Sequence, residues 1–431
     1  MESMASVRTR PSQWGRGRFR SRLLQLDSES LAAAACASFA LLLFVGDVKG
    51  SFLLDWLPFD TTAAMAGIVL VLSVFACLVR GGKIRVEGLW MLALFIAFSF
   101  ALLWTEFTPY SINKIGRFFT ISLIVGVLPA MILTRMRDVR LFINTIVAAG
   151  SLISMAALQQ VLFSGSIRGR IAGISSDTVS LGRSSGIALV GLYALSTSGR
   201  EGRLWRALLC LPLLLVLVAS SSRGPILFAL LVIAFVALRW SRKNLRVIAL
   251  ASGLFLLLAL LLVEGSFLLP KSTVAKIGSF LELRLDSSAE ERVKAGDAAI
   301  DEIVKSPLGL GIGGFSQVYN FGNATDRVYP HNIVLEIAVE EGWLVALIFV
   351  SLVIAGIVRG YRAAVAEASL RPFFAIFIFV CCNALVSGDM NDNRVLYALL
   401  CIALMAPALV RIEVPGAINM NELAAQAVGS R

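Results

Sequence analysis

Charged residues are scarce in this sequence, and histidine is almost absent. Only 16% of the 431 residues are Asp, Glu, Lys or Arg, whereas a soluble domain usually carries about 25%. Hydrophobic residues make up 58% of the chain, and the mean hydropathy is +0.82. This balance excludes an ordinary soluble domain and indicates an integral membrane protein.

The sequence also lacks the residue spacings that bind metals. Its six cysteines all lie in apolar runs, and none stands at metal-ligand spacing from the single histidine. No Asp-x-Asp pair and no cluster of histidine with carboxylates occurs. We therefore predict neither a metal ion nor a cofactor, and we interpret the cysteines as small packing residues.

About twelve apolar runs are long enough to cross a membrane as helices. They lie at Leu31 to Val45, Thr61 to Val79, Leu89 to Trp104, Ile115 to Thr134, Leu141 to Phe163, Leu181 to Thr197, Leu204 to Ala219, Pro225 to Leu238, Val247 to Val263, Gly342 to Val358, Phe373 to Val386 and Val395 to Val410. Strands of a membrane barrel would alternate apolar and polar residues over about 10 positions, which these runs do not do. The predicted fold class is all-α, a polytopic integral membrane helical bundle of about twelve transmembrane helices.

Basic residues fall in every second connection between these runs. If the N-terminus is cytoplasmic, the cytoplasmic connections are the basic ones, as the positive-inside rule requires. Their basic residues are Arg80, Lys83, Arg85, Arg135, Arg137, Arg140, Arg200, Arg203, Arg206, Arg239, Arg242, Lys243, Arg246, Arg359, Arg362 and Arg371. The opposite connections carry few basic residues, and the one from Ser387 to Asp392 is acidic. We predict that both termini are cytoplasmic.

This topology divides the chain into five parts. A cytoplasmic basic arm (1–30) precedes nine transmembrane helices (31–263), a large outer loop with short helices (264–341), three more transmembrane helices (342–410) and a cytoplasmic tail (411–431). The arginine-rich arm resembles a nucleic-acid arm, but before a first membrane span such an arm sets topology and contacts anionic lipid. We therefore expect no nucleic-acid partner, and we attribute the net charge of +11 to the positive-inside bias.

The outer loop contains one predicted helix and one glycine-rich turn. Ser288 to Glu291 fits a helix capping box, Val293, Ile300, Ile303 and Val304 then share a face, and Ser306-Pro307 ends the pattern. We expect an amphipathic helix at the membrane surface or against the bundle. The stretch from Gly309 to Phe315 lacks the Lys-Ser/Thr of a nucleotide-binding loop, so we interpret it as a flexible turn that lets backbone approach a substrate.

Several arginines gather at the same predicted membrane face. Arg223 lies in a short turn, Ser220 to Pro225, Arg183 opens the sixth apolar run, and Arg168 and Arg170 precede it. An arginine beside the hydrocarbon is costly, and such residues usually face a cavity or an anion. The alternative for Arg223 is a side chain that reaches a lipid phosphate. Several guanidinium groups at one face suit a diphosphate, which they bind in a bidentate manner.

The single histidine, His331, stands at the end of the outer loop, directly before an apolar run. It is the only side chain here whose ordinary pKa, about 6.5, lies near neutrality, so it is the candidate general base, with activity rising through that pH. The alternative is a packed or surface histidine without a role. Asn332 and Glu336 lie four positions apart, so in a helix they share a face.

Together these motifs resemble the O-antigen ligase and polysaccharide polymerase superfamily of lipid-linked glycan transferases. The resemblance rests on Ser222-Arg223-Gly224 opening a helix, Pro307-Leu308-Gly309-x-Gly311 in a large outer loop, and His331-Asn332-x-x-Leu335 followed by Glu340 and Gly342. It covers the topology of the whole chain. It implies a multi-pass protein of the bacterial inner membrane with a periplasmic site, so the outer loop would be periplasmic.

The resemblance also implies an activity and roles for residues. The protein would transfer a glycan from undecaprenyl diphosphate to lipid A core, as ligases do, or to another lipid-linked repeat, as polymerases do. Arg223 with Arg183, Arg170 and Arg292 would bind the diphosphate, His331 would deprotonate the acceptor hydroxyl, and the transfer would invert the anomeric centre without a metal. Asn332 and Glu336 would orient the acceptor.

The motifs do not separate a ligase from a polymerase, and they identify neither sugar nor acceptor. Two further readings stay open: a protein O-oligosaccharyltransferase of the same superfamily, and a multi-pass solute transporter. Transporters are often built from repeated halves with polar residues at the midplane. We find no obvious repeat in this chain, and its polar candidates lie at one face.

The topology generates a labelling prediction. In a background without the native cysteines, a cysteine placed at Ser279 is expected to react with a membrane-impermeant thiol reagent from the periplasm. A cysteine at Ser241 is expected to react only after the membrane is permeabilised. Reversed labelling would place His331 on the cytoplasmic side and contradict the predicted site.

Overall fold

A computed structural model describes most of the chain as α-helix. The described residues are 14–48, 57–163, 177–198, 203–220, 222–240, 287–319 and 327–413, and none of them forms a strand. Several expectations lie outside these ranges: the apolar run from Val247 to Val263, Arg170, residues 264–286 of the outer loop, residues 1–13 of the basic arm and residues 414–431 of the tail.

Eight helical stretches of the described residues are long and apolar enough to cross a membrane. They are Ser28–Val48, Thr61–Val79, Pro109–Ile132, Met136–Gln159, Thr178–Ser196, Arg223–Trp240, Trp343–Ala366 and Arg394–Arg411. Three shorter apolar helical stretches, Glu87–Leu103, Leu208–Ala219 and Ala368–Ala384, account for further expected runs. The prediction of a polytopic membrane helical protein is confirmed, and every expected run within the described ranges coincides with a helix.

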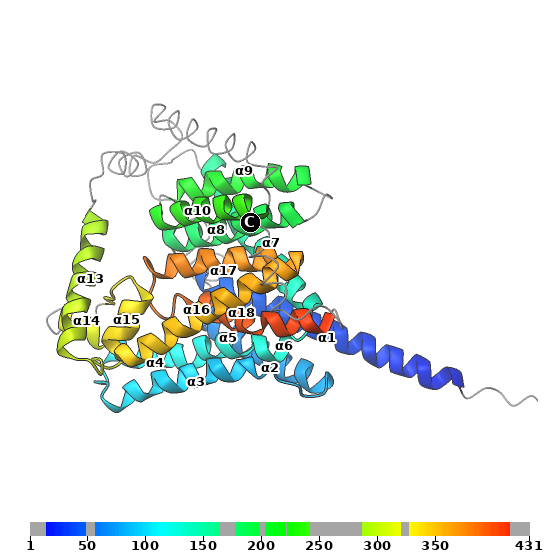
Figure 1. Ribbon diagram of the computed structural model, residues 1–431, viewed down its shortest axis with the longest axis horizontal. Helices are drawn as coiled ribbons and strands as arrows, with labels where there is room; N and C mark the ends of the chain where they lie inside the picture. Colours follow the sequence, from blue (N-terminus) through cyan, green and yellow to red (C-terminus); the bar gives the residue numbers. More distant parts are fainter. Residues whose placement is uncertain are drawn as a thin grey trace, which may run out of the picture.

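The helices of the bundle lie roughly side by side along the long axis of the molecule (Figure 1). They are α1 (Trp14–Val48), α2 (Thr61–Val79), α3 (Glu87–Ser99), α4 (Pro109–Arg117), α5 (Leu123–Val127), α6 (Pro129–Ile132), α7 (Met136–Phe163), α8 (Thr178–Ser198), α9 (Arg203–Ala219), α10 (Arg223–Trp240), α16 (Trp343–Ala366), α17 (Arg371–Ala384) and α18 (Arg394–Glu413). A π-helical turn, Phe118–Ser122, joins α4 to α5 within one span. This turn was not expected from the apolar pattern.

The helix α18 forms the centre of the bundle. It packs against α16, α17, α5 and α3, and its Tyr397 ring contacts Phe95, Phe118 and Phe349. Small residues allow close helix contact, since a Cβ on Gly186 would lie 2.2 Å from the Phe379 ring. Such small-residue contacts are typical of helices packed in membranes, where burial from lipid adds little driving force.

The predicted cytoplasmic connections contact one another at one end of the bundle, which we call the basic end. Arg80 makes a bidentate ion pair with Asp138, at 2.8 and 3.0 Å. Arg140 donates to Ser369 and Arg239 donates to Tyr361, which link further connections. The expected clustering of the basic connections on one side is therefore found among the described residues.

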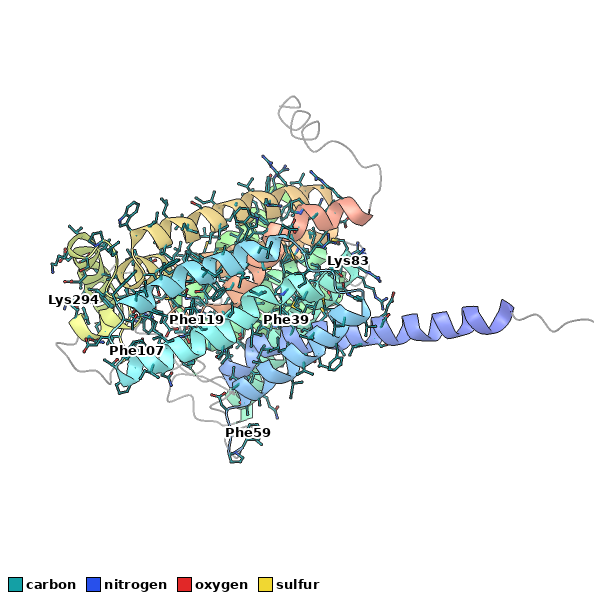
Figure 2. The ribbon with its side chains drawn as sticks, turned by 90° about the horizontal axis from the view of Figure 1, so that it is seen from below. Phe39, Phe59, Lys83, Phe107, Phe119 and Lys294 are labelled. Atoms are coloured by element: carbon teal, nitrogen blue, oxygen red, sulfur yellow. The ribbon has the colours of Figure 1, made fainter. Side chains whose placement is uncertain are left out.

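Three short helices cover the opposite end, which we call the loop end. They are α13 (Ser287–Lys305), α14 (Gly314–Tyr319) and α15 (Ile333–Glu340), and they lie far from the projecting start of α1 (Figure 1). Lys83 lies at the basic end, whereas Phe107 and Lys294 lie at the loop end (Figure 2). His331 directly precedes α15, so the loop end carries the candidate site.

The helix α13 forms as expected, but the side that packs against the protein is not the expected apolar face. Ala295 and Ala299 are buried against Phe315 and Val339, whereas Val293, Ile300 and Val304 are exposed. Only Ile303 of the expected face is partly buried. The small alanines permit a close approach to α15 that the larger residues would prevent, so helix contact selects the alanine face.

Candidate active site

The glycine-rich stretch after α13 forms a tight turn against the rest of the loop end. Gly309, Gly311 and Gly313 have φ of 88°, 82° and 80°, which residues with a Cβ rarely adopt. A Cβ on Gly309 would lie 2.3 Å from the Glu340 carbonyl oxygen, and one on Gly311 would lie 2.6 Å from the Thr105 Cα. The glycines thus allow an approach of protein backbone to protein backbone, whereas we expected an approach to substrate.

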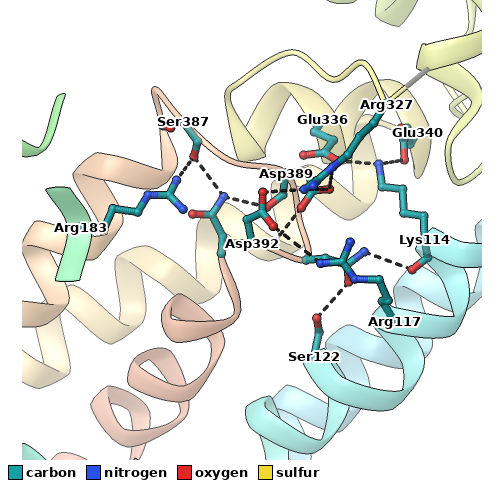
Figure 3. Close-up of polar contacts among 12 residues, drawn as sticks. Lys114, Arg117, Ser122, Arg183, Arg327, Glu336, Glu340, Ser387, Asp389 and Asp392 are labelled. Atoms are coloured by element: carbon teal, nitrogen blue, oxygen red, sulfur yellow. Dashed lines mark hydrogen bonds and ion pairs between the residues drawn. The ribbon is translucent and has the colours of Figure 1, made fainter. Parts of the chain in front are cut away.

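A buried ionic cluster joins this turn to α4 and α15. The Lys114 ammonium lies 2.5 Å from Glu336 Oε1 and 2.6 Å from Glu340 Oε2. The lysine side chain is 2% exposed and both glutamates are 0% exposed. Glu340 Oε2 also accepts a 2.8 Å hydrogen bond from the Gly313 amide. We call Lys114, Glu336 and Glu340 the buried triad; Figure 3 shows it beside the arginines of the site.

Asn332 and His331 form the entry to α15. Asn332 is the N-cap, and its side-chain oxygen accepts from the Val334 and Leu335 amides. His331 has φ 57°, the only positive φ of a non-glycine residue among those described. The His331 ring packs against the Tyr329 ring at a centroid distance of 4.4 Å. The Arg327 guanidinium lies over the Tyr329 ring, 5.5 Å from its centroid.

The connection between α17 and α18, residues 385–393, collects arginines from three distant segments. Arg183 donates to the Ser387 carbonyl, and Arg292 donates to the Val386 carbonyl at 3.1 Å. Arg327 pairs with Asp389 at 2.8 Å and with Asp392 at 2.6 Å. Figure 3 shows Arg183 and Arg327 approaching this 385–393 loop from opposite sides.

Two other residues, Arg223 and Arg170, were also predicted to bind the diphosphate. Arg223 begins α10, and a Cβ on the next residue, Gly224, would lie 3.0 Å from Val386 Cγ2. The start of α10 is therefore adjacent to the loop that Arg183 and Arg292 contact. Arg170 lies outside the described residues. The structure thus gathers Arg183, Arg292 and His331 around one loop, with Arg223 at its edge.

The predicted acceptor-orienting residues are both engaged within the protein. Asn332 caps α15, and Glu336 pairs with Lys114 in the buried triad. Glu336 does lie four residues after Asn332 in the helical direction, as expected, but its carboxylate points into the protein. Both residues are placed to hold the segment that carries His331.

The electrostatic environment keeps His331 neutral. Burial, together with the charges of Arg292, Arg183 and Arg327, lowers the pKa of its imidazole to about 4, although Asp389 opposes the shift. The expectation of titration near 6.5 is therefore wrong for the ligand-free protein. A neutral imidazole has a free ring nitrogen, so His331 can accept a proton at neutral pH.

Burial and nearby cations act in opposite directions on the carboxylates around the site. Burial would raise the pKa of Asp389, but Arg327 and Lys114 hold it below its ordinary value. Burial raises the pKa of Glu336 to about 8 although Lys114 opposes the shift. Asp389 therefore carries negative charge at neutral pH, and the Lys114 ammonium opposes protonation of Glu336.

A polar cavity lies beside Arg183, between α1, α8, α17 and α18. Its polar lining residues are Asp47, Arg183, Ser184, Asn383, Asp392, Asn393 and Arg394. Arg183 Nε and Asn383 Oδ1 of this lining, and His331 Nδ1 outside it, are buried and have no hydrogen-bond partner among the described residues. Such unsatisfied groups are uncommon in protein interiors and require an explanation, of which a bound polar ligand is one. Among the described residues, no three His, Cys, Asp or Glu side chains form a metal-binding group.

Sequence reasoning missed three parts of this site. The sequence patterns pointed to neither Lys114 nor Arg327, and the acidic 385–393 loop served only to predict topology. A usable signal was present in that loop, because Asp389 and Asp392 in a short connection between apolar helices need cationic partners. No comparable signal pointed to the pairing of Lys114 with residues more than two hundred positions away.

The electrostatics generate a direct spectroscopic prediction. Because the chain has one histidine, isotope-labelled histidine gives a single imidazole signal in NMR. We expect this signal to titrate near about 4 in the ligand-free protein and near a higher pH in Arg292→Gln, which removes a positive charge. Lys294→Gln, two positions away on the exposed face of α13, is the matched control and is expected to leave the titration unchanged. A titration midpoint of 6.5 for His331 in the native protein would contradict a buried imidazole surrounded by arginines.

Comparison with known proteins adds an independent finding. Residues 208–350 match the model of a protein family described as O-antigen ligase. The matched range includes Arg223, Arg292 and His331, whereas Lys114, Arg183 and the 385–393 loop lie outside it. The search of curated proteins gave no match to the chain. On the family match, the chain carries an O-antigen ligase family domain over residues 208–350.

Proposed function

We propose that this protein is a glycosyltransferase that uses undecaprenyl diphosphate-linked glycan as its donor. It transfers the glycan at the periplasmic face of the bacterial inner membrane, either to lipid A core or to a second lipid-linked repeat. The observation that carries the proposal is one neutral histidine beside several arginines at the loop end of a membrane bundle. The O-antigen ligase family domain supports the same substrate class.

Arg183 and Arg292 are best placed to bind the diphosphate. Their guanidinium groups reach adjacent carbonyls, those of Ser387 and Val386, so both cations lie on the same short stretch of backbone. Arg327 instead pairs with two aspartates, which compensate its charge. Arg223, at the start of α10 beside Val386, and Arg170 complete the proposed set. Guanidinium groups bind phosphate oxygens in bidentate fashion and stabilise the charge of a departing diphosphate.

His331 acts as the general base in this proposal. The acceptor hydroxyl transfers its proton to the imidazole while its oxygen bonds to the anomeric carbon, and the bond from that carbon to the diphosphate breaks. The electron pair of this bond leaves with the diphosphate, so the configuration inverts in one step. The proton then passes from His331 to solvent.

Binding of the donor strengthens this base. The same arginines that hold the diphosphate lower the pKa of His331 to about 4 together with burial, so a bound anion offsets part of their effect. The imidazole thus becomes more basic when the donor is in place. This coupling favours proton abstraction in the complex over the free protein.

The proposal is tested by reconstitution of the purified protein with lipid-linked glycan. Single transfer to added lipid A core would establish a ligase, and a ladder formed from lipid-linked repeats alone would establish a polymerase. Transfer to an added acceptor protein would indicate a protein O-oligosaccharyltransferase. Glycan movement into vesicles without any new glycosidic bond would support the transporter and contradict the proposal.

The first mutational prediction concerns His331. His331→Ala is expected to lower kcat about a hundred- to ten-thousand-fold, because a positioned base is lost, while the donor affinity changes little. In the native protein, kcat is expected to fall at a higher pH than kcat/KM as the medium is acidified, because the bound diphosphate raises the pKa of the base. Normal turnover with an unchanged pH profile in His331→Ala would show that the imidazole is a packing residue.

The second mutational prediction concerns Arg223. Arg223→Lys keeps the positive charge but loses the planar, two-pronged donor geometry. We expect this variant to insert and accumulate normally and to lose most of its transfer activity. Arg239→Lys, at the other end of the same helix α10, is the matched control and is expected to remain active. Native turnover in Arg223→Lys would remove the residue from the diphosphate site.

A further inference from the structure

The buried triad connects three separate segments of the site. Lys114 comes from α4, both glutamates come from α15, and Glu340 also accepts from the Gly313 amide of the glycine-rich turn. The Lys114 carbonyl in addition accepts a 3.2 Å hydrogen bond from Asn391 of the 385–393 loop. One residue of a membrane span thus contacts the helix after His331 and the loop that receives the arginines (Figure 3), and it reaches the glycine-rich turn through Glu340.

This arrangement is costly in stability terms. Moving charges from water into an apolar interior carries a desolvation penalty that the ion pair often only repays, so apolar residues of equal volume are often at least as stable. The geometry is nevertheless specific, because an ammonium between two carboxylates fixes the position of both. The triad is therefore better suited to fixing the position of α15 than to adding stability.

The segment that carries His331 needs contacts that hold it in position. His331 has a positive φ, which is unfavourable for a residue with a Cβ and persists only where the surroundings determine it. Asn332 joins it to α15 through the helix cap, and Glu336 follows one turn later on the same helix. A shift of Glu336 away from Lys114 would move the first turn of α15 and with it the imidazole.

We propose that Lys114 is a positioning residue for glycan transfer, which holds α15 through Glu336 and Glu340 so that His331 faces the bound diphosphate. This inference rests on the proposed function. Lys114 touches neither donor nor acceptor and acts through His331. The hydrogen bond from Asn391 to the Lys114 carbonyl holds the 385–393 loop against the same membrane span.

The test uses full-length protein and two ways of removing the triad. Lys114→Met deletes the cation and leaves two glutamates in an apolar interior. The neutral variant, Lys114→Met with Glu336→Gln and Glu340→Gln, deletes all three charges at nearly constant volume. Its matched control is Arg80→Met with Asp138→Asn, which neutralises the largely buried pair at the basic end of the bundle, far from the site.

Activity separates positioning from general stability. In the neutral variant we expect kcat to fall about a hundred-fold, since a displacement of about 1 Å in a catalytic group has this effect, while KM for the donor stays within a few-fold. We expect the Arg80 and Asp138 control to show a similar or larger fall in melting temperature with native kcat. Native kcat in the neutral variant overturns the proposal, as does failure of that variant to accumulate while the control accumulates.

The imidazole signal reports the position of His331 without any assay of activity. If His331 moves away from Arg183, Arg292 and Arg327, its titration midpoint rises from about 4 toward its ordinary value in the neutral variant. In the Arg80 and Asp138 control the midpoint stays unchanged. An unchanged midpoint in the neutral variant shows that the imidazole has not moved and contradicts the positioning role.

A double-mutant cycle shows through which residue Lys114 acts. When the neutral substitutions are added to His331→Ala, we expect no further loss of residual activity, because the base that they position is already absent. Losses that multiply show an independent effect and overturn the proposal. If His331→Ala itself retains native activity, the proposed function fails; if it is inactive while the neutral variant has native activity, only the role of Lys114 fails.

Discussion

The need to compensate charges buried at the end of an apolar bundle determines the structure of the loop end. Lys114 lies between two fully buried glutamates, and Asp389 is matched by Arg327. Removal of one partner from such a pair typically costs about 3–5 kcal/mol, because it leaves an uncompensated charge. These pairs therefore fix the relative positions of α4, α15 and the 385–393 loop, which are far apart in sequence.

The same charge balance divides the arginines between two tasks. Arg327 is compensated by Asp389 and Asp392, so its main effect is to hold the 385–393 loop in place. Arg183 and Arg292 donate to adjacent backbone carbonyls of that loop, which holds both guanidinium groups against the same stretch of backbone. In the proposed function, this ordering of guanidinium groups through carbonyls preorganises them for a diphosphate.

The sequence predicted the helices well because membrane burial requires long apolar runs, and Thr61 to Val79 matches α2 residue for residue. It did not predict that α16 continues past Val358 to Ala366. A helix can extend beyond its apolar run when long side chains such as Arg359 and Arg362 reach the membrane interface. His331, Arg183 and Arg292 were expected in the site because their residue types carry chemistry. Lys114 was not expected in the site, because its pairing with Glu336 spans 222 positions and depends on tertiary structure.

In the proposed function, preorganisation of the arginines and basicity of the histidine oppose each other. Guanidinium groups close enough to bind a diphosphate also disfavour the protonated imidazole, and the pKa of His331 is accordingly about 4. A base so weakened would be inefficient unless the donor were bound, since the donor supplies the negative charge that restores its proton affinity. The arrangement thus links proton abstraction to donor occupancy. An acceptor hydroxyl that reaches His331 in the absence of donor meets a poor base, which limits unproductive deprotonation without any moving part.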